Sequence, residues 1–183
     1  SKWSASAALG RNTSIPAKSW SISARSIVSS QPQSRETVAA AREAGATVSL
    51  DCGWDETMER AEIGQLLAGI DVFLPNAAEA DHLDRLGVHP QAATLAVIKR
   101  GASGASALVD GTEIHEPALG VTPVDSTGAG DAFNAGFLSA WLAAEPLAVC
   151  LRAGNATGAR AIARRGGFPA AEAAPTRASA LTP

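Results

Sequence analysis

The sequence is poor in aromatic side chains, which make up 4% of its 183 residues. Small residues are abundant instead, with alanine frequent and 17 glycines present. Such a composition favours helices packed closely on a sheet over a β-sandwich, whose core needs bulkier side chains. The length suits one domain with enough residues to bury a core.

Other features are also missing. The two cysteines, Cys52 and Cys150, are far apart and have no metal-like spacing, so we expect neither a disulfide framework nor a zinc site. No apolar run approaches a membrane span, and the N-terminus has no signal-peptide core. The net charge of −3 gives no indication of a nucleic-acid or membrane surface. We therefore expect a cytoplasmic protein, and the lack of a starting methionine suggests a fragment or a processed chain.

Short apolar runs alternate with helical patterns through the middle of the chain. We expect strands over residues 22–28, 46–51, 70–74 and 95–99, with helices from 34 to 44, 61 to 68 and 75 to 86 between them. After Lys99, an Asp110–Gly111 turn predicts a hairpin over residues 105–114, and two helices follow over 132–143 and 147–163. This order predicts an α/β fold with a three-layer, Rossmann-like sheet, mostly parallel with an antiparallel edge and helices on both faces.

The two ends of the chain read differently from the middle. Residues 1–23 show no lasting period of 2 or 3.6 and are expected to form a weakly specified lead-in. Residues 169–183 are rich in alanine and proline and are expected to be a disordered tail. The domain is therefore expected to span residues 24–168.

The stretch from Val124 to Phe133 combines two glycines with an acid near each end. Apolar residues then recur at helical spacing, so a helix should begin within or just after the glycines. Such a turn presents unpaired N–H groups and the positive end of the helix dipole to an anion such as phosphate. Asp131 would be a poor phosphate ligand but a suitable general base for a hydroxyl attacking the phosphate. Alternatively, Asp131 only caps the helix.

Polar residues also follow three expected strands, at the edge where open α/β sheets bind ligands. Asp51 follows one strand, Asn76 and Glu79 the next, and Lys99 ends a third. A carboxylate beside a phosphate requires a cation, so Glu79 with Asn76 is a candidate outer support for hydrated Mg²⁺. Asn76 and Glu79 could equally form a capping box, and Asp51 could be only a strand-end acid. The three histidines are scattered without metal spacing and are interpreted as ordinary core or surface residues.

Three segments resemble, in order and spacing, the motifs of the ribokinase/PfkB family of sugar kinases. Asp125–Phe133 matches the second signature of that family almost letter for letter, Asn76–Glu79 matches its Asn-x-x-Glu element, and Lys99–Ala105 resembles its nucleotide segment. The resemblance covers residues 34–167. It implies a ribokinase-like fold and the transfer of phosphate from ATP, with Mg²⁺, to the hydroxyl of a small sugar-like substrate.

The resemblance also implies a role for each matching residue. Asp131 would be the catalytic base, and the N–H groups of Gly128, Ala129 and Gly130 would form the anion hole. Asn76 and Glu79 would position the phosphates and Mg²⁺, Glu79 through water. The nucleotide would be lined by Lys99, Arg100, Gly101, Ala102, Ser103 and Gly104, with Asn155 near the adenine. Asp125 and Thr127 stand where many members bind a monovalent cation, such as K⁺, through backbone oxygens.

The chain departs from the family in what precedes these motifs. Family members have an N-terminal half with most sugar contacts, a β-lid and a Gly-Gly signature, and residues 1–23 contain none of these. Two hypotheses therefore remain: a sugar kinase, with a nucleoside kinase as a variant, or a non-catalytic nucleotide-binding remnant. A sheet without its N-terminal strands would expose an edge, so we expect a homodimer or pairing with a complementary chain.

Overall fold

The computed structural model describes residues 22–23, 32–51 and 60–166, and the structural statements below concern these residues. The elements are, in order, β1 (Ile22–Ser23), α2 (Pro32–Glu43), β2 (Val48–Leu50), α3 (Arg60–Leu67), β3 (Val72–Phe73), α4 (Ala77–Arg85), η1 (Pro90–Ala92), β4 (Leu95–Lys99), η2 (Gly101–Ser103), β5 (Ala105–Val109), β6 (Thr112–Glu116), α5 (Ala129–Leu142) and α6 (Leu147–Ile162). The expected tail, most of the expected lead-in and residues 24–28 of the first expected strand lie outside the described residues.

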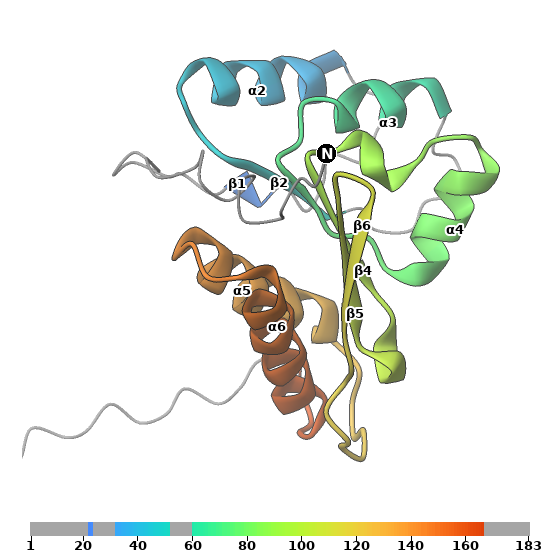
Figure 1. Cartoon of the computed structure of the whole chain (residues 1–183), viewed down its shortest axis with the longest axis vertical. Coiled ribbons are helices and arrows are strands. Elements are labelled where there is room, and N and C mark those ends of the chain that lie inside the picture. The colour runs from blue at the N-terminus through green and yellow to red at the C-terminus, as the bar shows by residue number, and fades with distance from the viewer. Residues whose placement is uncertain (1–21, 24–31, 52–59, 167–183) are drawn as a thin grey trace, which may run out of the picture.

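The described strands form one sheet in the sequential order β1 to β6. The strands β1 to β4 run parallel, whereas β4, β5 and β6 pair antiparallel. Crossovers between parallel strands are right-handed, and the strand order advances in one direction, so α2, α3 and α4 must lie on the same face. Figure 1 shows these helices grouped apart from α5 and α6, with β4, β5 and β6 between the groups. The expected mostly parallel sheet with an antiparallel edge and helices on both faces is confirmed.

Two apolar cores lie on opposite faces of the sheet, because successive side chains of a strand alternate between the faces. Leu50 and Phe73 pack with side chains of α2, α3 and α4. Val72, Leu74 and Val97 pack instead with Phe133 and other side chains of α5 and α6. The paired residues Ser49 and Val72, and then Val72 and Leu95, fix which positions share the second face. By this alternation Asp51 and Lys99 belong to the face covered by α5 and α6.

Glycine conformations explain where several elements end. Gly45 and Gly87 follow α2 and α4 with φ of +73° and +69°, as expected from their positions in the sequence.

The expected first residues of two helices are wrong by a few positions. Helix α2 begins at Pro32 rather than near Ser34, because proline is well suited to the first turn of a helix. Helix α5 begins at Ala129 rather than Ala132, because Gly128, with φ +74°, already acts as its N-cap.

The β5–β6 hairpin follows directly from its turn residues. Asp110 and Gly111 both have positive φ, +48° and +73°, which is the requirement of a two-residue type I′ turn. The expected hairpin is confirmed, although β6 continues to Glu116, two residues beyond the expected end. In the described part of the chain, no helix is long and apolar enough to cross a bilayer.

The helices α5 and α6 cross at very short distance. A Cβ added at Gly136 would lie 2.3 Å from Oγ1 of Thr157 and 2.6 Å from the carbonyl oxygen of Ala153. A Cβ added at Gly154 would lie 2.7 Å from the ring of Phe133. Glycine is therefore required on both helices, and this contact fixes α5 on the sheet together with the loop before it.

Candidate active site

The residues expected at the carboxyl ends of the strands do lie at one edge of the sheet. Asp51 directly follows β2, Asn76 follows β3 and precedes α4, and Lys99 is the last residue of β4. Asn76 and Lys99 form an isolated parallel bridge, and the Lys99 N–H donates to the carbonyl of Pro75 at 2.9 Å. The sheet therefore joins the Asn-x-x-Glu segment to the start of the expected nucleotide segment.

Lys99 lies in a polar cluster between the sheet and α5. Its Nζ donates to Oδ2 of Asp51 at 2.8 Å and to Oδ1 of Asn134 at 3.4 Å. Asn134 closes the cluster by donating from Nδ2 to the same Asp51 oxygen. The side chains of Lys99 and Asp51 are 13% and 26% exposed, so the ion pair is partly shielded from water but still reachable by a ligand. The cluster ties β2, β4 and α5 together.

The N-terminus of α5 is open to a ligand. Gly128 is its N-cap in the left-handed conformation and, as a glycine, has no side chain with which to cap the helix. The carbonyl of Gly128 accepts from Ala132, whereas the Ala129 N–H donates to Ser126 at 3.2 Å. The ammonium of Lys99 is close to this turn, because a Cβ added at Gly130 would lie 3.5 Å from its Nζ. N–H groups and a cation therefore lie together, as required for an anion site.

Asp131 is in the first turn of α5 and its side chain is exposed. Asn134 follows it by three residues, a spacing that places two side chains on the same side of a helix. Because Asn134 reaches Lys99, Asp131 stands at the side of α5 that faces the strand ends. The catalytic role expected for Asp131 stays a prediction.

Asn76 and Glu79 form a complete capping box at the start of α4. The Asn76 side chain accepts from the Glu79 N–H at 2.9 Å, and Oε2 of Glu79 accepts from the Asn76 N–H at 2.8 Å. Glu79 is only 7% exposed. The structural interpretation of this pair is therefore correct. A carboxylate accepts more than one hydrogen bond, so the capping box leaves the magnesium role open as a prediction.

The expected nucleotide segment forms the short helix η2 and ends at Gly104, which has φ +97°. A Cβ at Gly104 would lie 2.1 Å from the Glu116 carbonyl oxygen and 2.7 Å from Ala118 N. Asn155 of α6 holds the same loop by donating to the carbonyls of Glu116 and Pro117 at 3.1 and 3.0 Å. The segment 100–104, the loop after β6 and α6 therefore meet at one junction. Asn155 is 8% exposed, so its proposed contact with adenine stays a prediction.

We expect Gly104→Ala to lower the free energy of unfolding by more than about 3 kcal/mol, because its Cβ would overlap backbone atoms of a second loop and its φ suits only glycine. Chemical denaturation measures the effect. Gly101→Ala is the matched control, because Gly101 has φ +57° and nothing within 4 Å of an added Cβ. It should cost only about 1–2 kcal/mol, the strain of the left-handed conformation. Equal costs for the two substitutions would contradict the close approach of the loops.

Asp125 fastens the glycine turn to the end of α6. Its Oδ1 accepts from the Thr127 N–H at 2.9 Å, and its Oδ2 accepts from the Gly166 N–H at 3.1 Å. The N–H groups of Val124 and Asp125 both donate to the carbonyl of Ile162. The carboxylate therefore acts structurally, and the expected cation role of Asp125 and Thr127 concerns their backbone oxygens only.

We expect the pKa of the Asp125 carboxyl to lie below its ordinary value, because hydrogen bonds from Thr127 and then Gly166 stabilise the ionised form. The ionised Asp125 carboxylate therefore stabilises the folded protein at pH values above its ordinary pKa. This stabilisation is lost as the pH falls through the lowered pKa of the folded state. Carbon-detected NMR titration of the carboxyl measures this directly. An Asp125 pKa at or above the ordinary value would contradict the two hydrogen bonds that this carboxylate accepts from Thr127 and Gly166.

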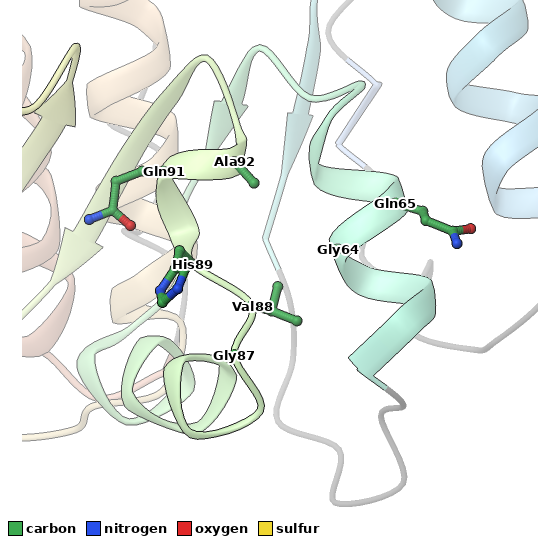
Figure 2. Close-up of a pocket in the computed structure, with 7 residues that line it drawn as sticks. All are labelled: Gly64, Gln65, Gly87, Val88, His89, Gln91 and Ala92. Atoms are coloured by element: carbon green, nitrogen blue, oxygen red, sulfur yellow. The ribbon is translucent and has the colours of Figure 1, made fainter.

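A groove on the described part of the chain lies away from these residues. It has a volume of about 540 Å³ and is lined by Gly64, Gln65, Gly87, Val88, His89, Gln91 and Ala92. Figure 2 shows it between α3 and the loop that leads through η1 to the start of β4, at the amino end of that strand. Its lining includes no carboxylate, lysine or arginine, so it does not have the chemistry of a phosphate site.

The structure brings Lys99 together with Asp51, Asn76 and the glycine turn before α5, and it adds one residue that was not singled out in the sequence. Asn134 was not expected in the site, whereas Asp51 was expected at this edge of the sheet, with a plain strand-end acid as the alternative; both contact Lys99. Strand alternation places Asp51 and Lys99 on the same face, and the three-residue spacing of Asp131 and Asn134 was visible in the sequence. Neither signal by itself indicates that the groups touch.

Comparison with known proteins identifies the family. The model of the "pfkB family carbohydrate kinase" matches residues 17–174, which is most of the chain. The chain belongs to the pfkB family of carbohydrate kinases. A curated relative, the ATP-dependent ribose-1-phosphate kinase of Halopiger xanaduensis, is 35% identical over 157 residues, covering 82% of this chain and 50% of the relative. The acarbose 7(IV)-phosphotransferase of Actinoplanes sp. is 44% identical over 123 residues, covering 63% of this chain and 40% of the relative.

Solved structures of the same kind agree with the fold. The aminoimidazole riboside kinase from Salmonella enterica, solved with aminoimidazole riboside and an ATP analogue, superposes with a TM-score of 0.60 at 30% identity. The match covers 72% of this chain and 51% of that one. The pfkB-family chain described here thus spans about half the length of the relatives it matches, or less.

Proposed function

We propose that the protein transfers the γ-phosphoryl group of ATP to a hydroxyl of a sugar or nucleoside. The observation that carries this proposal is the juxtaposition, at one edge of the sheet, of the N-terminus of α5, the Lys99 ammonium and the Asp131 carboxylate. Membership of the pfkB family, whose relatives include sugar and riboside kinases by name, supports the reaction class.

In this reaction Asp131 accepts the proton of the acceptor hydroxyl as its oxygen bonds to the γ-phosphorus. The bond between that phosphorus and the β–γ bridging oxygen breaks, and ADP leaves with the electron pair. N–H groups of the turn Gly128–Gly130 stabilise the charge on the phosphoryl oxygens during transfer. The residues 99–104 and Asn155 line the nucleotide. Exposed apolar side chains in the loop before α5, Leu119, Val121 and Val124, offer a surface suited to a purine ring.

The chain's donor set suits a magnesium ion carried by the nucleotide. Within the described ranges, no group of three or more histidine, cysteine or acidic side chains could hold a metal alone. Mg²⁺ commonly relies on one or two carboxylates together with phosphates and water, and it supplies neutralisation of phosphate charge when bound. Glu79 fits such a role through water. Backbone oxygens of Asp125 and Thr127 are the proposed monovalent-cation ligands, and comparing nucleotide affinity in KCl and NaCl tests that role.

The second candidate is a nucleotide-binding module without catalytic activity of its own. It is favoured by the contacts in the described part of the chain, which hold the proposed phosphate and nucleotide segments and assign no side chain to binding a sugar or nucleoside. Strand β1 is the terminal strand of the described sheet, so a second copy or a complementary chain could pair with it. Light scattering tests this assembly, and a stable monomer would count against it.

A coupled ADP-release assay with a panel of sugars and nucleosides separates the two candidates. The proposed kinase gives ADP release that depends on one class of acceptor and exceeds the ATPase background. Nucleotide binding without acceptor-dependent turnover supports the module instead. The panel also decides between sugar and nucleoside, which the described residues leave open.

A further inference from the structure

We propose that Lys99 binds the phosphoryl group in transfer and that Asp51 and Asn134 are positioning residues that hold its ammonium toward Gly130. This inference rests on the proposed function, because it assumes that phosphate occupies the N-terminus of α5. It assigns a task to two side chains, Asp51 and Asn134, that the sequence motifs do not assign.

The first support is the scarcity of lysine. Lys99 is the only lysine between residues 19 and 183, where the other basic side chains are arginines and three histidines. Lysine supplies a compact point charge with three rotatable donors, whereas arginine supplies a rigid planar fork. A narrow space beneath a glycine turn, where a Cβ at Gly130 would already lie 3.5 Å from Nζ, accommodates the compact group.

The second support is the count of donors. An ammonium has three N–H groups and no acceptor. One donates to Asp51 and one to Asn134, and these partners lie on β2's end and on α5 respectively. With two directions fixed, the third N–H is constrained to a narrow range, and among the described residues Nζ has no third partner. Nearness to Gly130 makes the phosphoryl oxygen bound at that turn its natural acceptor.

The third support is the charge arrangement. Asp51 and Lys99 form a pair that is nearly neutral from a distance, so Lys99 contributes little to long-range attraction of ATP. Its effect is a short, charge-assisted hydrogen bond at a fixed place. Asn134 donates to Asp51 as well as accepting from Lys99, so the three side chains orient one another. Loss of either positioning residue should therefore misplace the ammonium without removing its charge.

The test measures binding of a non-hydrolysable ATP analogue and of ADP, both with Mg²⁺, by calorimetry on the full chain. Lys99→Met should weaken binding of the analogue by about 10- to 100-fold, the range of a charge-assisted hydrogen bond. The affinity for ADP should change by less than about threefold. Asp51→Ala and Asn134→Ala should each weaken the analogue selectively by about 3- to 10-fold. Asp51→Asn keeps an acceptor and should restore most of the affinity that Asp51→Ala loses.

The matched control is Arg42→Met, which removes the cation of the Arg42–Asp71 pair on the opposite face of the sheet. It should leave both affinities unchanged. A second readout needs no substitution: brief acetylation followed by mass spectrometry should find Lys99 protected by the analogue but much less by ADP, with Lys2 and Lys18 as internal references.

Each outcome decides the proposal. If Lys99→Met lowered the affinities for ADP and for the analogue equally, the phosphoryl contact would be overturned. Equal protection of Lys99 by both nucleotides would overturn it as well. Unchanged affinities in both alanine variants would overturn the positioning role. These results leave the proposed kinase function standing, whereas a wild-type chain that binds neither nucleotide contradicts the function itself and the inference with it.

Discussion

Replacing Asp131 with asparagine is expected to lower the rate of phosphoryl transfer by about 10²- to 10⁴-fold. Asparagine has nearly the same shape, but its amide cannot accept the proton of the acceptor hydroxyl. The N–H groups of the glycine turn are unchanged, so ATP affinity should stay within about threefold of the wild type. A coupled ADP-release assay with the acceptor identified from the panel measures the rate, and calorimetry measures the affinity.

The matched control for this substitution is Asp110→Asn. Asp110 lies in the β5–β6 turn with φ +48°, and asparagine is favoured in that turn. The control should keep full activity. If Asp131→Asn also kept the wild-type rate, Asp131 would not be the catalytic base.

Gly136→Ala is expected to lower the free energy of unfolding by about 3 kcal/mol. The added Cβ would lie 2.6 Å from the carbonyl oxygen of Ala153, a backbone atom that moves only if α6 moves. The crossing of α5 and α6 would widen, so the α5 N-terminus would also shift against Lys99. Chemical denaturation measures the loss, and calorimetry with ATP should show weaker binding in the folded variant.

Gly158→Ala in α6 is the control for that substitution. Its Cβ would meet Ala129 O at 3.4 Å and Cβ of Phe133 at 3.7 Å, which are ordinary contacts. Alanine is the better helix former, so this change should be neutral or stabilise the protein by up to about 1 kcal/mol. Equal destabilisation by both substitutions would contradict the close crossing at Gly136.

Much of the fold could be predicted from sequence because its signals are local. Gly45 and Gly87 end helices through their own left-handed conformation, and Asp110 with Gly111 makes a turn that needs no distant partner. The start of α5 was predicted three residues late. Helical spacing in the sequence is set by apolar residues from Phe133 onward, whereas the first turn is fixed by Gly128 acting as N-cap.

The site was predictable residue by residue only where a motif carried it. The capping box of Asn76 and Glu79 follows from their spacing, and the structure contains it. The cluster around Lys99 could not be predicted in the same way, because Asp51 and Asn134 are separated by 83 positions and meet only when α5 packs on the sheet. The hydrogen bonds of Asn155 to two backbone carbonyls could not be predicted for the same reason, because those carbonyls belong to a loop 38 and 39 positions away.

The central claim is that this chain carries the nucleotide site of a pfkB-family kinase, and calorimetric titration of the folded 183-residue chain with MgATP tests it most directly. We predict saturable binding at one site, competition by ADP, and selective weakening of the ATP analogue by Lys99→Met. A chain that is folded by circular dichroism and gives no binding at millimolar MgATP would contradict the claim.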